Sequence, residues 1–316
     1  MSFLTVKNVS KLEGGIETVK DISFSQGPLQ NVAIAGETGS GKTTLVKMIA
    51  GLTQPGSGEI KFLNKKVRGP LEKLMPGHPG IVYLSQQFEL HNNYYVHEIL
   101  SYANQLSAEE AHTLYSICRI DHLLKRKTDQ LSGGEKQRIA LAKLLVSSPK
   151  LLLLDEPFSN LDVIHKTIIR SVLKDLKEKL QISTIMISHD AQDILAWADS
   201  IIILKDGVLI QQATPEDIYR QPVNEYCAAL FGEYSLVEME GKDKRLFLRP
   251  EDIFITKNRN EALFGALVKD VRFHGAYYII EANSDIGELK IKSQDKNIKP
   301  GNFIYLAFEK DSEWYL

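Results

Sequence analysis

The stretch Gly36-Glu37-Thr38-Gly39-Ser40-Gly41-Lys42-Thr43 decides the fold of this chain. It fits the pattern G-x-x-x-x-G-K-[ST], follows the apolar run 31–35 and opens a helical pattern that includes Leu45 and Ile49. A strand, a glycine-rich loop and a helix in this order are typical of a phosphate-binding loop, because the loop amides and the helix N-terminus attract anions. A glycine-rich turn capped by a threonine is the weaker alternative.

This motif predicts ATP and Mg²⁺ as ligands. Lys42 would bridge the β- and γ-phosphates, and the hydroxyl of Thr43 would bind Mg²⁺. We expect the nucleotide to contact Gly36, Glu37, Thr38, Gly39, Ser40, Gly41, Lys42, Thr43 and Thr44.

A second run, Leu151-Leu152-Leu153-Leu154-Asp155-Glu156-Pro157, is an apolar strand that ends in two acids. Asp155 would hold Mg²⁺ through water, and Glu156 would accept a proton from the water that attacks the γ-phosphate. Taken alone, the two acids are better explained as the start of a helix. The phosphate loop upstream makes them the expected second half of a magnesium-nucleotide site.

The order of the elements predicts an α/β fold in two domains. Of the 316 residues, 43% are hydrophobic and 25% are charged, which is ordinary for a globular protein. Strand-like runs at 31–35, 81–84, 151–154 and 183–188 alternate with helical segments, a pattern typical of a largely parallel sheet. A strand-free stretch, about 90–130, predicts an inserted helical subdomain.

The chain changes character after residue 232. Short alternating runs at 263–273, 276–282, 288–291 and 303–308 are separated by turn sequences, which predicts a small β-barrel. We therefore expect an ATPase domain at 1–234 and a barrel domain at 235–316.

The run Leu131-Ser132-Gly133-Gly134-Glu135-Lys136-Gln137-Arg138 resembles the signature motif of ABC ATPases. Its serine and glycines would stand at a helix N-terminus, which is an anion site, although a serine-capped helix needs no ligand. The resemblance covers residues 1 to about 230. It implies that two copies pack head to tail, with ATP between the phosphate loop of one copy and Ser132, Gly133 and Gly134 of the other.

The same resemblance assigns further positions. Gln86 is similar to the Q-loop glutamine that senses metal and water, and Asp162 ends the D-loop-like run Ser159-Asn160-Leu161-Asp162. His189 resembles the switch histidine that contacts the γ-phosphate, although a lone histidine at a strand end is usually only a satisfied polar residue. Leu12 stands where many relatives place an aromatic residue against adenine, so we expect apolar contact there.

The C-terminal run Leu248-Arg249-Pro250-Glu251-Asp252-Ile253 and the strands after it resemble the transport-associated OB-like domain of importer ATPases. Such importers carry polyamines, ferric iron, sulfate, molybdate or maltose-like sugars. The resemblance implies an importer for a small solute, a polyamine or ferric iron being our preference, located peripherally at the cytoplasmic face of the inner membrane. Its implied partners are a second copy, integral-membrane permease subunits and, indirectly, a solute-binding protein.

The permease is expected to dock on the aromatic and apolar stretch after Gln86, which contains Phe88, Leu90, Tyr94, Tyr95 and Val96. Core packing of the helical subdomain explains each of these residues equally well.

Action on nucleic acid or ribosomes, and export, are the two alternatives to import. An ABC ATPase acting on nucleic acid or ribosomes is disfavoured by the balanced charge of residues 235–316, with 13 Lys plus Arg against 14 Asp plus Glu. An exporter subunit is disfavoured because no apolar run approaches the roughly 18 residues of a membrane span. From the balanced charge of residues 235–316, the sequence predicts no nucleic-acid partner.

Overall fold

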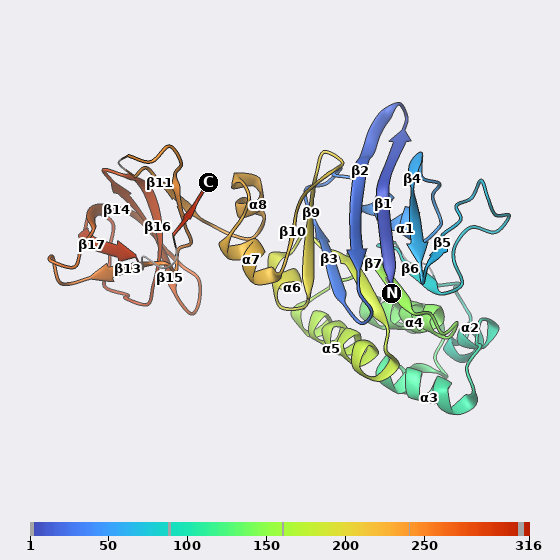
Figure 1. The fold of residues 1–316 in the computed structure, drawn as a ribbon. Coiled ribbons are helices and arrows are strands. Elements are labelled where there is room, and N and C mark those ends of the chain that lie inside the picture. The colour runs from blue at the N-terminus through green and yellow to red at the C-terminus, as the bar shows by residue number, and fades with distance from the viewer. Residues whose placement is uncertain (1–2, 88–89, 160, 240, 309–312) are drawn as a thin grey trace. The chain divides into compact units, whose positions relative to one another are not determined.

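The computed structural model describes residues 3–87, 90–159, 161–239, 241–308 and 313–316. The chain forms two compact units, Met1–Pro215 and Glu216–Leu316. Figure 1 shows two sheets and most of the helices in the first unit, and mainly strands in the second.

The central sheet of the first unit has six strands in the order β10-β9-β3-β8-β7-β6. All neighbours are parallel except β10, which forms an antiparallel hairpin with β9. The strands are β3 (Asn31–Ala35), β6 (Ile81–Leu84), β7 (Leu151–Asp155), β8 (Ser183–Ile187), β9 (Ser200–Lys205) and β10 (Val208–Ala213). Every residue of β3, β7 and β8 is buried, as expected for strands covered on both faces. The four predicted strand runs are confirmed to within one residue.

A second sheet is antiparallel, in the order β2-β1-β4-β5. Its strands are β1 (Leu4–Glu13), β2 (Ile16–Gln26), β4 (Ser57–Phe62) and β5 (Lys65–Lys66). The expectation of one largely parallel sheet was therefore incomplete. The pairing of β1 with β2 shifts register three times, so no clean alternation of apolar and polar residues marks these strands in the sequence.

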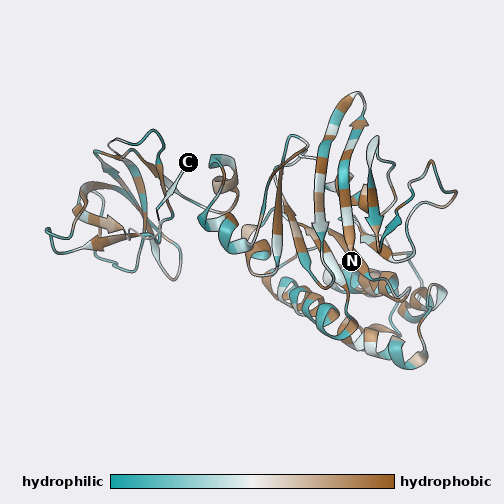
Figure 2. Ribbon diagram, viewed as in Figure 1, coloured by the Kyte–Doolittle hydropathy of each residue, from teal (hydrophilic) through white to brown (hydrophobic). Residues whose placement is uncertain are grey.

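The strands of the central sheet separate two hydrophobic cores. Leu151 and Leu153 of β7 pack in one core with α1 (Lys42–Ile49) and the antiparallel sheet. Leu152 and Leu154 pack in the other core with the helices on the opposite face. This alternation follows from the period of two in a strand. Figure 2 shows hydrophobic residues along these strands and on part of α5.

The helices of the second core are α2 (Val96–Tyr102), α3 (Ala108–Ile117), α4 (Gly133–Leu145) and α5 (Val163–Leu180). Between β6 and β7 the described residues form helices, 3-10 turns and loops, with one isolated bridge between Tyr95 and Lys127. That stretch contains the predicted helical segment. Among the described residues, none of the helices has the length and apolar character that crossing a bilayer takes.

The second unit contains a three-stranded sheet, β11-β12-β18, and a five-stranded sheet, β13-β17-β14-β15-β16. The strands are β11 (Ser235–Val237), β12 (Leu246–Leu248), β13 (Ile253–Thr256), β14 (Phe264–Phe273), β15 (Tyr278–Ser284), β16 (Gly287–Ser293), β17 (Phe303–Phe308) and β18 (Trp314–Tyr315). All strand pairs are antiparallel, and the inward side chains form a separate core. The C-terminal part is thus rich in β-structure.

The two units divide at Pro215–Glu216, ahead of the expected boundary at 234/235. Two short helices, α7 (Pro215–Arg220) and α8 (Glu225–Leu230), account for the difference. The buried guanidinium of Arg249, just after β12, donates hydrogen bonds to the backbone oxygens of Tyr219, Ala228, Gly232 and Glu233. These bonds tie both helices to the strands that follow them.

Candidate functional site

The phosphate loop joins β3 to α1, and two of its glycines cannot be replaced without a clash. Gly36 has φ 144°, and a Cβ there would lie 2.2 Å from the carbonyl oxygen of Leu204 on β9. Gly41 has φ 92°, and a Cβ there would lie 2.2 Å from the carbonyl oxygen of Thr18. Glycine therefore lets this loop pass close to neighbouring backbone in a left-handed conformation.

Lys42 lies inside the curve of the loop. Its Nζ donates to the carbonyl oxygens of Gly36 (2.8 Å) and Glu37 (2.6 Å) and to Oγ of Ser40 (3.3 Å). Burial lowers the pKa of Lys42, while the nearby carboxylates of Glu156, Asp155 and Glu37 oppose that shift. Glu37, Thr38 and Gly39 are exposed at the loop tip.

Thr43 and Asp155, both predicted as magnesium ligands, are hydrogen-bonded to each other. The Thr43 hydroxyl donates to Oδ2 of Asp155 at 3.0 Å, joining the first turn of α1 to the carboxyl end of β7. Tyr83 on β6 donates to the same oxygen at 2.8 Å. Burial, followed by the bond to Asp155, raises the pKa of Tyr83 well above its usual range, so the phenol stays a donor.

Sequence reasoning missed Tyr83. Its signal was a polar group in an otherwise apolar strand run, next to the strand that carries Asp155. The parallel register places Tyr83 opposite Leu153, two residues before Asp155, and thus on the same face.

The oxygen pair formed by Thr43 and Asp155 fits a magnesium ion. One hydroxyl and one carboxylate from two different elements are hard oxygen ligands, which Mg²⁺ prefers together with water and phosphate oxygens. Gln86 is the third residue predicted at the metal site, and among the described residues its side chain donates a hydrogen bond to Glu156 and not to Asp155 or Thr43.

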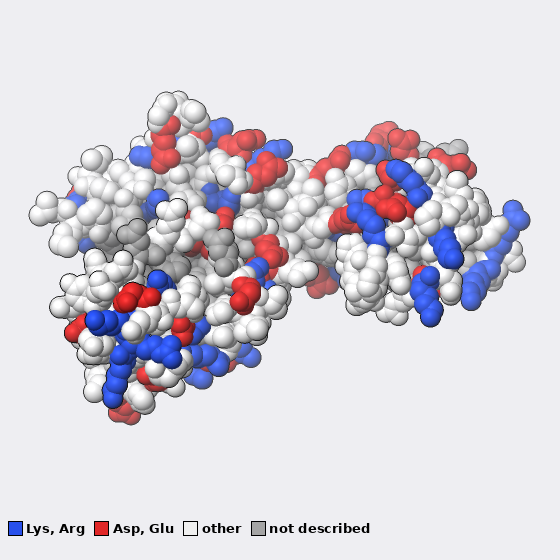
Figure 3. Space-filling view, turned by 180° about the vertical axis from the view of Figure 1, so that it is seen from behind, with Lys and Arg blue, Asp and Glu red and all other residues white. Residues whose placement is uncertain are grey.

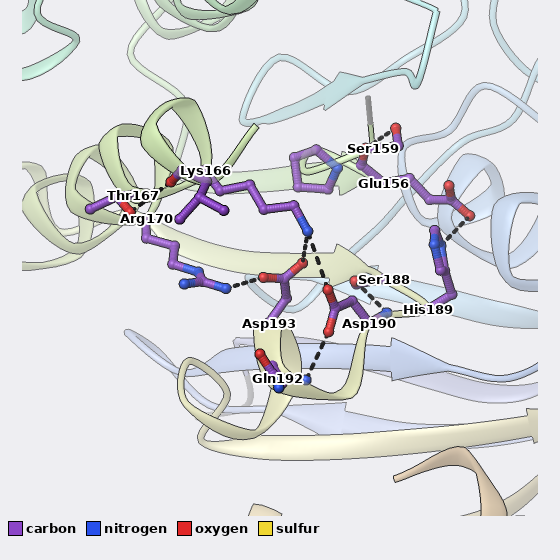
Figure 4. Close-up of polar contacts among 12 residues, drawn as sticks. Glu156, Ser159, Lys166, Thr167, Arg170, Ser188, His189, Asp190, Gln192 and Asp193 are labelled. Carbon is purple, nitrogen blue, oxygen red and sulfur yellow. Dashed lines mark hydrogen bonds and ion pairs between the residues drawn. The ribbon is translucent and has the colours of Figure 1, made fainter. Parts of the chain in front are cut away.

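The three predicted catalytic residues lie together, with Gln86 and His189 both beside the carboxylate of Glu156. Gln86 donates from Nε2 to Oε2 of Glu156 at 3.2 Å, and Nδ1 of His189 lies 3.5 Å from Oε1. The carboxylate and the imidazole point toward one another in Figure 4. They line a small cavity of about 160 Å³ together with Ser159, Lys166 and Asp193 among others.

The backbone at Glu156 is left-handed, with φ 50°. Its N–H donates to the carbonyl oxygen of Ile187 at the end of β8, and its carbonyl accepts from Oγ of Ser159. A non-glycine residue in this conformation is strained and needs such support. The turn after β7 therefore fixes where the carboxylate points.

Ser132 caps α4, as expected. Its side chain accepts from the N–H of Glu135, whose carboxylate accepts from the N–H of Ser132 in return. Gly134 is buried, and a Cβ there would lie 2.3 Å from Cδ2 of His165 on α5. A Cβ at Gly133 would meet no atom of the described residues within 4 Å, so among them this side of the helix end is open.

The remaining predicted residues lie at the surface. Asp162 caps α5 by accepting from the N–H of His165 at 2.8 Å, and Asn160 lies outside the described residues. Leu12 is 63% exposed near the end of β1, whose Glu13 accepts from Oγ1 of Thr44 at 3.3 Å. That contact places the end of β1 beside the first turn of α1.

The predicted docking stretch is only partly exposed. Tyr94 and Tyr95 are exposed and Leu90 is half-buried, whereas Val96 is fully buried among the helices. Including Val96 in a docking surface was therefore wrong, because it begins α2 and faces the core. Phe88 lies outside the described residues.

The pattern of the ABC transporter family matches residues 19–159, which contain the phosphate loop, the signature run and Glu156.

Among curated proteins, the spermidine/putrescine import ATP-binding protein PotA of Clostridium acetobutylicum is 31% identical over 88% of this chain and 86% of its own. Among solved structures, cbiO1 of Clostridium perfringens, part of the ABC transporter complex cbiONQ, has 27% identity and a TM-score of 0.61, covering 69% of this chain and 90% of its own. An ATP-binding cassette solved as a dimer with ADP and Pi has 28% identity and a TM-score of 0.57, covering 67% and 98%.

Proposed function

Because the chain belongs to the ATP-binding subunits of ABC transporters, we propose that it powers an importer for a small solute, with polyamines as the leading candidates. The chain is an ATP-hydrolysing enzyme, and the proposal concerns the cargo, the direction of transport and the residue roles. The assigned residue roles rest on the position of Glu156, whose carboxylate lies beside both Gln86 and His189.

The extent of the similarity to a polyamine importer subunit supports import. A match over 88% of the chain is longer than the first unit and takes in part of the second. The second unit, an antiparallel β-structure with its own core, suits a transport-associated OB-like domain. The face of this unit seen in Figure 3 carries both signs of charge close together, which does not favour nucleic acid. Ferric iron is the alternative cargo.

The chemistry follows from groups that already face each other. Lys42 and the loop amides would bind the β- and γ-phosphates, whose negative charge the ammonium offsets. Glu156 would accept the proton of the attacking water, a role worth about 10²- to 10⁴-fold in rate. Gln86 donates to one oxygen of that carboxylate and Nδ1 of His189 lies 3.5 Å from the other, so both residues help to orient it. His189 would also contact the γ-phosphate.

Mg²⁺, when bound by Thr43 and Asp155, would neutralise charge on the phosphates. The hydrogen bond from Tyr83 keeps the Asp155 carboxylate in place at the end of β7.

Each ATP would be held between two copies of the chain. In the part of the chain that the structure describes, an added Cβ would meet no atom within 4 Å at Gly133, in the first turn of α4, or at Gly39, at the tip of the phosphate loop. Two open anion-binding surfaces on one chain can complete each other in a head-to-tail pair. Association of the pair with permease subunits would place the chain peripherally at the cytoplasmic face of the membrane, and a solute-binding protein would act indirectly.

The enzymatic part of the proposal is tested with the purified full chain beside Lys42→Ala and Glu156→Gln. We expect both variants to lose phosphate release, and only Glu156→Gln to form a stable dimer in MgATP, measured by light scattering. A Glu156→Gln chain that stays monomeric, or that hydrolyses ATP at the wild-type rate, would rule out the assigned role.

The cargo is tested in cells whose own copy carries Glu156→Gln. We expect uptake of labelled spermidine or putrescine to fall and uptake of labelled ferric iron to stay unchanged. The opposite result would assign the ferric iron alternative, and unchanged uptake of both would reject this pair of cargoes.

A further inference from the structure

A cluster of four charged residues lies behind the His189–Glu156 pair. Lys166 and Arg170 come from α5, while Asp190 and Asp193 come from the turn and short helix α6 (Ala191–Leu195) that follow His189. Lys166 Nζ lies 3.2 Å from Oδ2 of Asp190 and 3.4 Å from Oδ2 of Asp193, and Arg170 is hydrogen-bonded to Oδ1 of Asp193. Figure 4 shows both cations reaching the acids from α5. We call these four residues the anchoring cluster.

One acid of the anchoring cluster, Asp193, is buried, so its ion pairs are not merely contacts between exposed side chains. Its side chain is 0% exposed although α6 has only five residues. A buried carboxylate is costly unless it is paired and hydrogen-bonded, so the two cations from α5 are required for α6 to pack where it does. Lys166 and Arg170 are four residues apart and lie on one face of α5, where they reach both oxygens of this carboxylate.

The anchoring cluster is directly connected to His189 along the chain, through Asp190. Asp190 is the next residue, and its side chain caps α6 by accepting from the N–H of Gln192 at 3.0 Å. Its N–H donates to Oγ of Ser188, the residue before His189. Burial would raise the pKa of Asp190, but the hydrogen bond from Lys166 and the backbone bonds lower it overall, so the pair stays charged. The residue after His189 is therefore held from α5, and a local bond links it to the residue before His189.

The cluster also contacts the Glu156 side of the site. The Arg170 guanidinium lies 5.7 Å from the ring centroid of Phe158, two residues after Glu156. Helix α5 begins at Val163, only a few residues further on, and its first turn exposes Val163 and Ile164. One helix thus contacts Phe158 and Asp190, which lie within two residues of Glu156 and His189, and also presents its first turn to solvent.

We propose that Lys166 and Arg170 are positioning residues that keep His189 against Glu156 by anchoring Asp190 and Asp193, and that they make the position of His189 depend on helix α5. This inference rests on the proposed role of His189 in hydrolysis. A movement of α5, such as packing of a second copy against its exposed first turn, would be transmitted to the histidine through these ion pairs.

The test compares two lysines of the same helix in the full chain. Lys166→Met removes the ammonium from the cluster, and Lys166→Arg restores the positive charge. Lys177→Met is the matched control, because Lys177 also lies on α5, pairs with Asp199 at 2.7 Å and has a similar exposure, 31% against 25% for Lys166. The Lys177 pair has no member in the turn that carries His189.

We expect Lys166→Met to lower kcat by on the order of ten- to a hundredfold, since a small displacement of a catalytic group has effects of this size. KM for MgATP should stay within about twofold, because the phosphate loop is untouched. Amide hydrogen exchange over residues 188–195 should become faster in Lys166→Met, and not in Lys177→Met. Lys166→Arg should recover most of the lost rate.

The inference is overturned if Lys166→Met keeps wild-type kcat, or if it loses rate while exchange over 188–195 is unchanged. An equal loss in Lys177→Met would also contradict it. Arg170→Met replaces Lys166→Met if the latter does not fold, with the same expectations. His189→Ala separates the two hypotheses: an active His189→Ala rejects the proposed role of the histidine, whereas an inactive one beside an active Lys166→Met rejects only the positioning.

Discussion

Tyr83 illustrates how one side chain can support a site without being part of a motif. Its hydroxyl donates to Asp155 at 2.8 Å from the neighbouring strand, and Thr43 approaches the same oxygen at 3.0 Å. Because Asp155 is buried, each of these bonds satisfies a charge that water reaches poorly.

We predict that Tyr83→Phe lowers the stability of the first unit by about 1.5 to 3 kcal/mol near pH 8, the usual worth of a hydrogen bond to a charged group. The effect should shrink as the pH rises. A phenol is charged only after it loses its proton, and the raised pKa means that the unfolded chain loses that proton first. The wild-type protein therefore loses stability relative to Tyr83→Phe above about pH 10.

Urea unfolding at pH 8 and at pH 10.5 measures both parts of this prediction. Tyr102→Phe serves as the control, because that tyrosine is 80% exposed. A difference between wild type and Tyr83→Phe that is constant over this range would contradict the pKa direction.

At the scale of secondary-structure elements, the contact between α4 and α5 depends on the absence of a side chain. A Cβ at Gly134 would lie 2.3 Å from Cδ2 of His165, whose ring also contacts Asp162 at the start of α5. The N-terminus of α4 can thus approach α5 closely only because residue 134 is glycine. The signature run therefore has a packing requirement in addition to its anion-binding end.

We predict that Gly134→Ala destabilises the first unit by about 1 to 3 kcal/mol, the usual cost of overpacking. His165→Ala should remove most of this cost by making room for the new methyl group. Gly133→Ala is the matched control, since a Cβ there meets none of the described atoms within 4 Å. A double-mutant cycle from calorimetric unfolding measures the coupling, and additive effects of Gly134→Ala and His165→Ala would contradict it.

At the scale of the whole molecule, the two units differ in what holds them together. The first is built on apolar strands covered by helices. The second has an apolar core of its own, and its buried Arg249, which is 1% exposed, ties two short helices to its strands. Its guanidinium lies 4.1 Å from the ring centroid of Tyr219 and 4.9 Å from that of Phe247, in addition to its four backbone acceptors.

We predict that Arg249→Leu destabilises the second unit by about 3 kcal/mol or more, because several buried carbonyl oxygens lose their donor. The ATPase rate of the full chain should stay within about twofold of wild type, since every residue assigned to hydrolysis lies in the first unit. Calorimetry and phosphate release measure the two effects. Arg259→Leu, at a residue that is exposed, provides the control. A loss of ATPase activity without a loss of stability would place Arg249 in the site.

Much of the α/β architecture was predictable from local patterns. The runs at 31–35, 81–84 and 151–154 are short, apolar and followed by loop or helix signals, and they form β3, β6 and β7. The antiparallel sheet was not predicted, because β1 shifts register where it pairs with β2 and its sequence therefore lacks a regular alternation of apolar and polar residues. The helices α7 and α8 were assigned to the ATPase domain because the bonds that tie them to the second unit come from Arg249, far along the chain.

The sequence by itself determined the chemistry of this protein, because a phosphate loop, an acidic strand end and a signature run are local patterns whose spacing carries their meaning. Only the tertiary structure decided which groups face each other: Gln86 and His189 at the two oxygens of Glu156, Tyr83 on Asp155, and Lys166 with Arg170 on the buried Asp193. These partners come from different strands and helices. Their meeting depends on sheet order and register, which no local window of sequence contains.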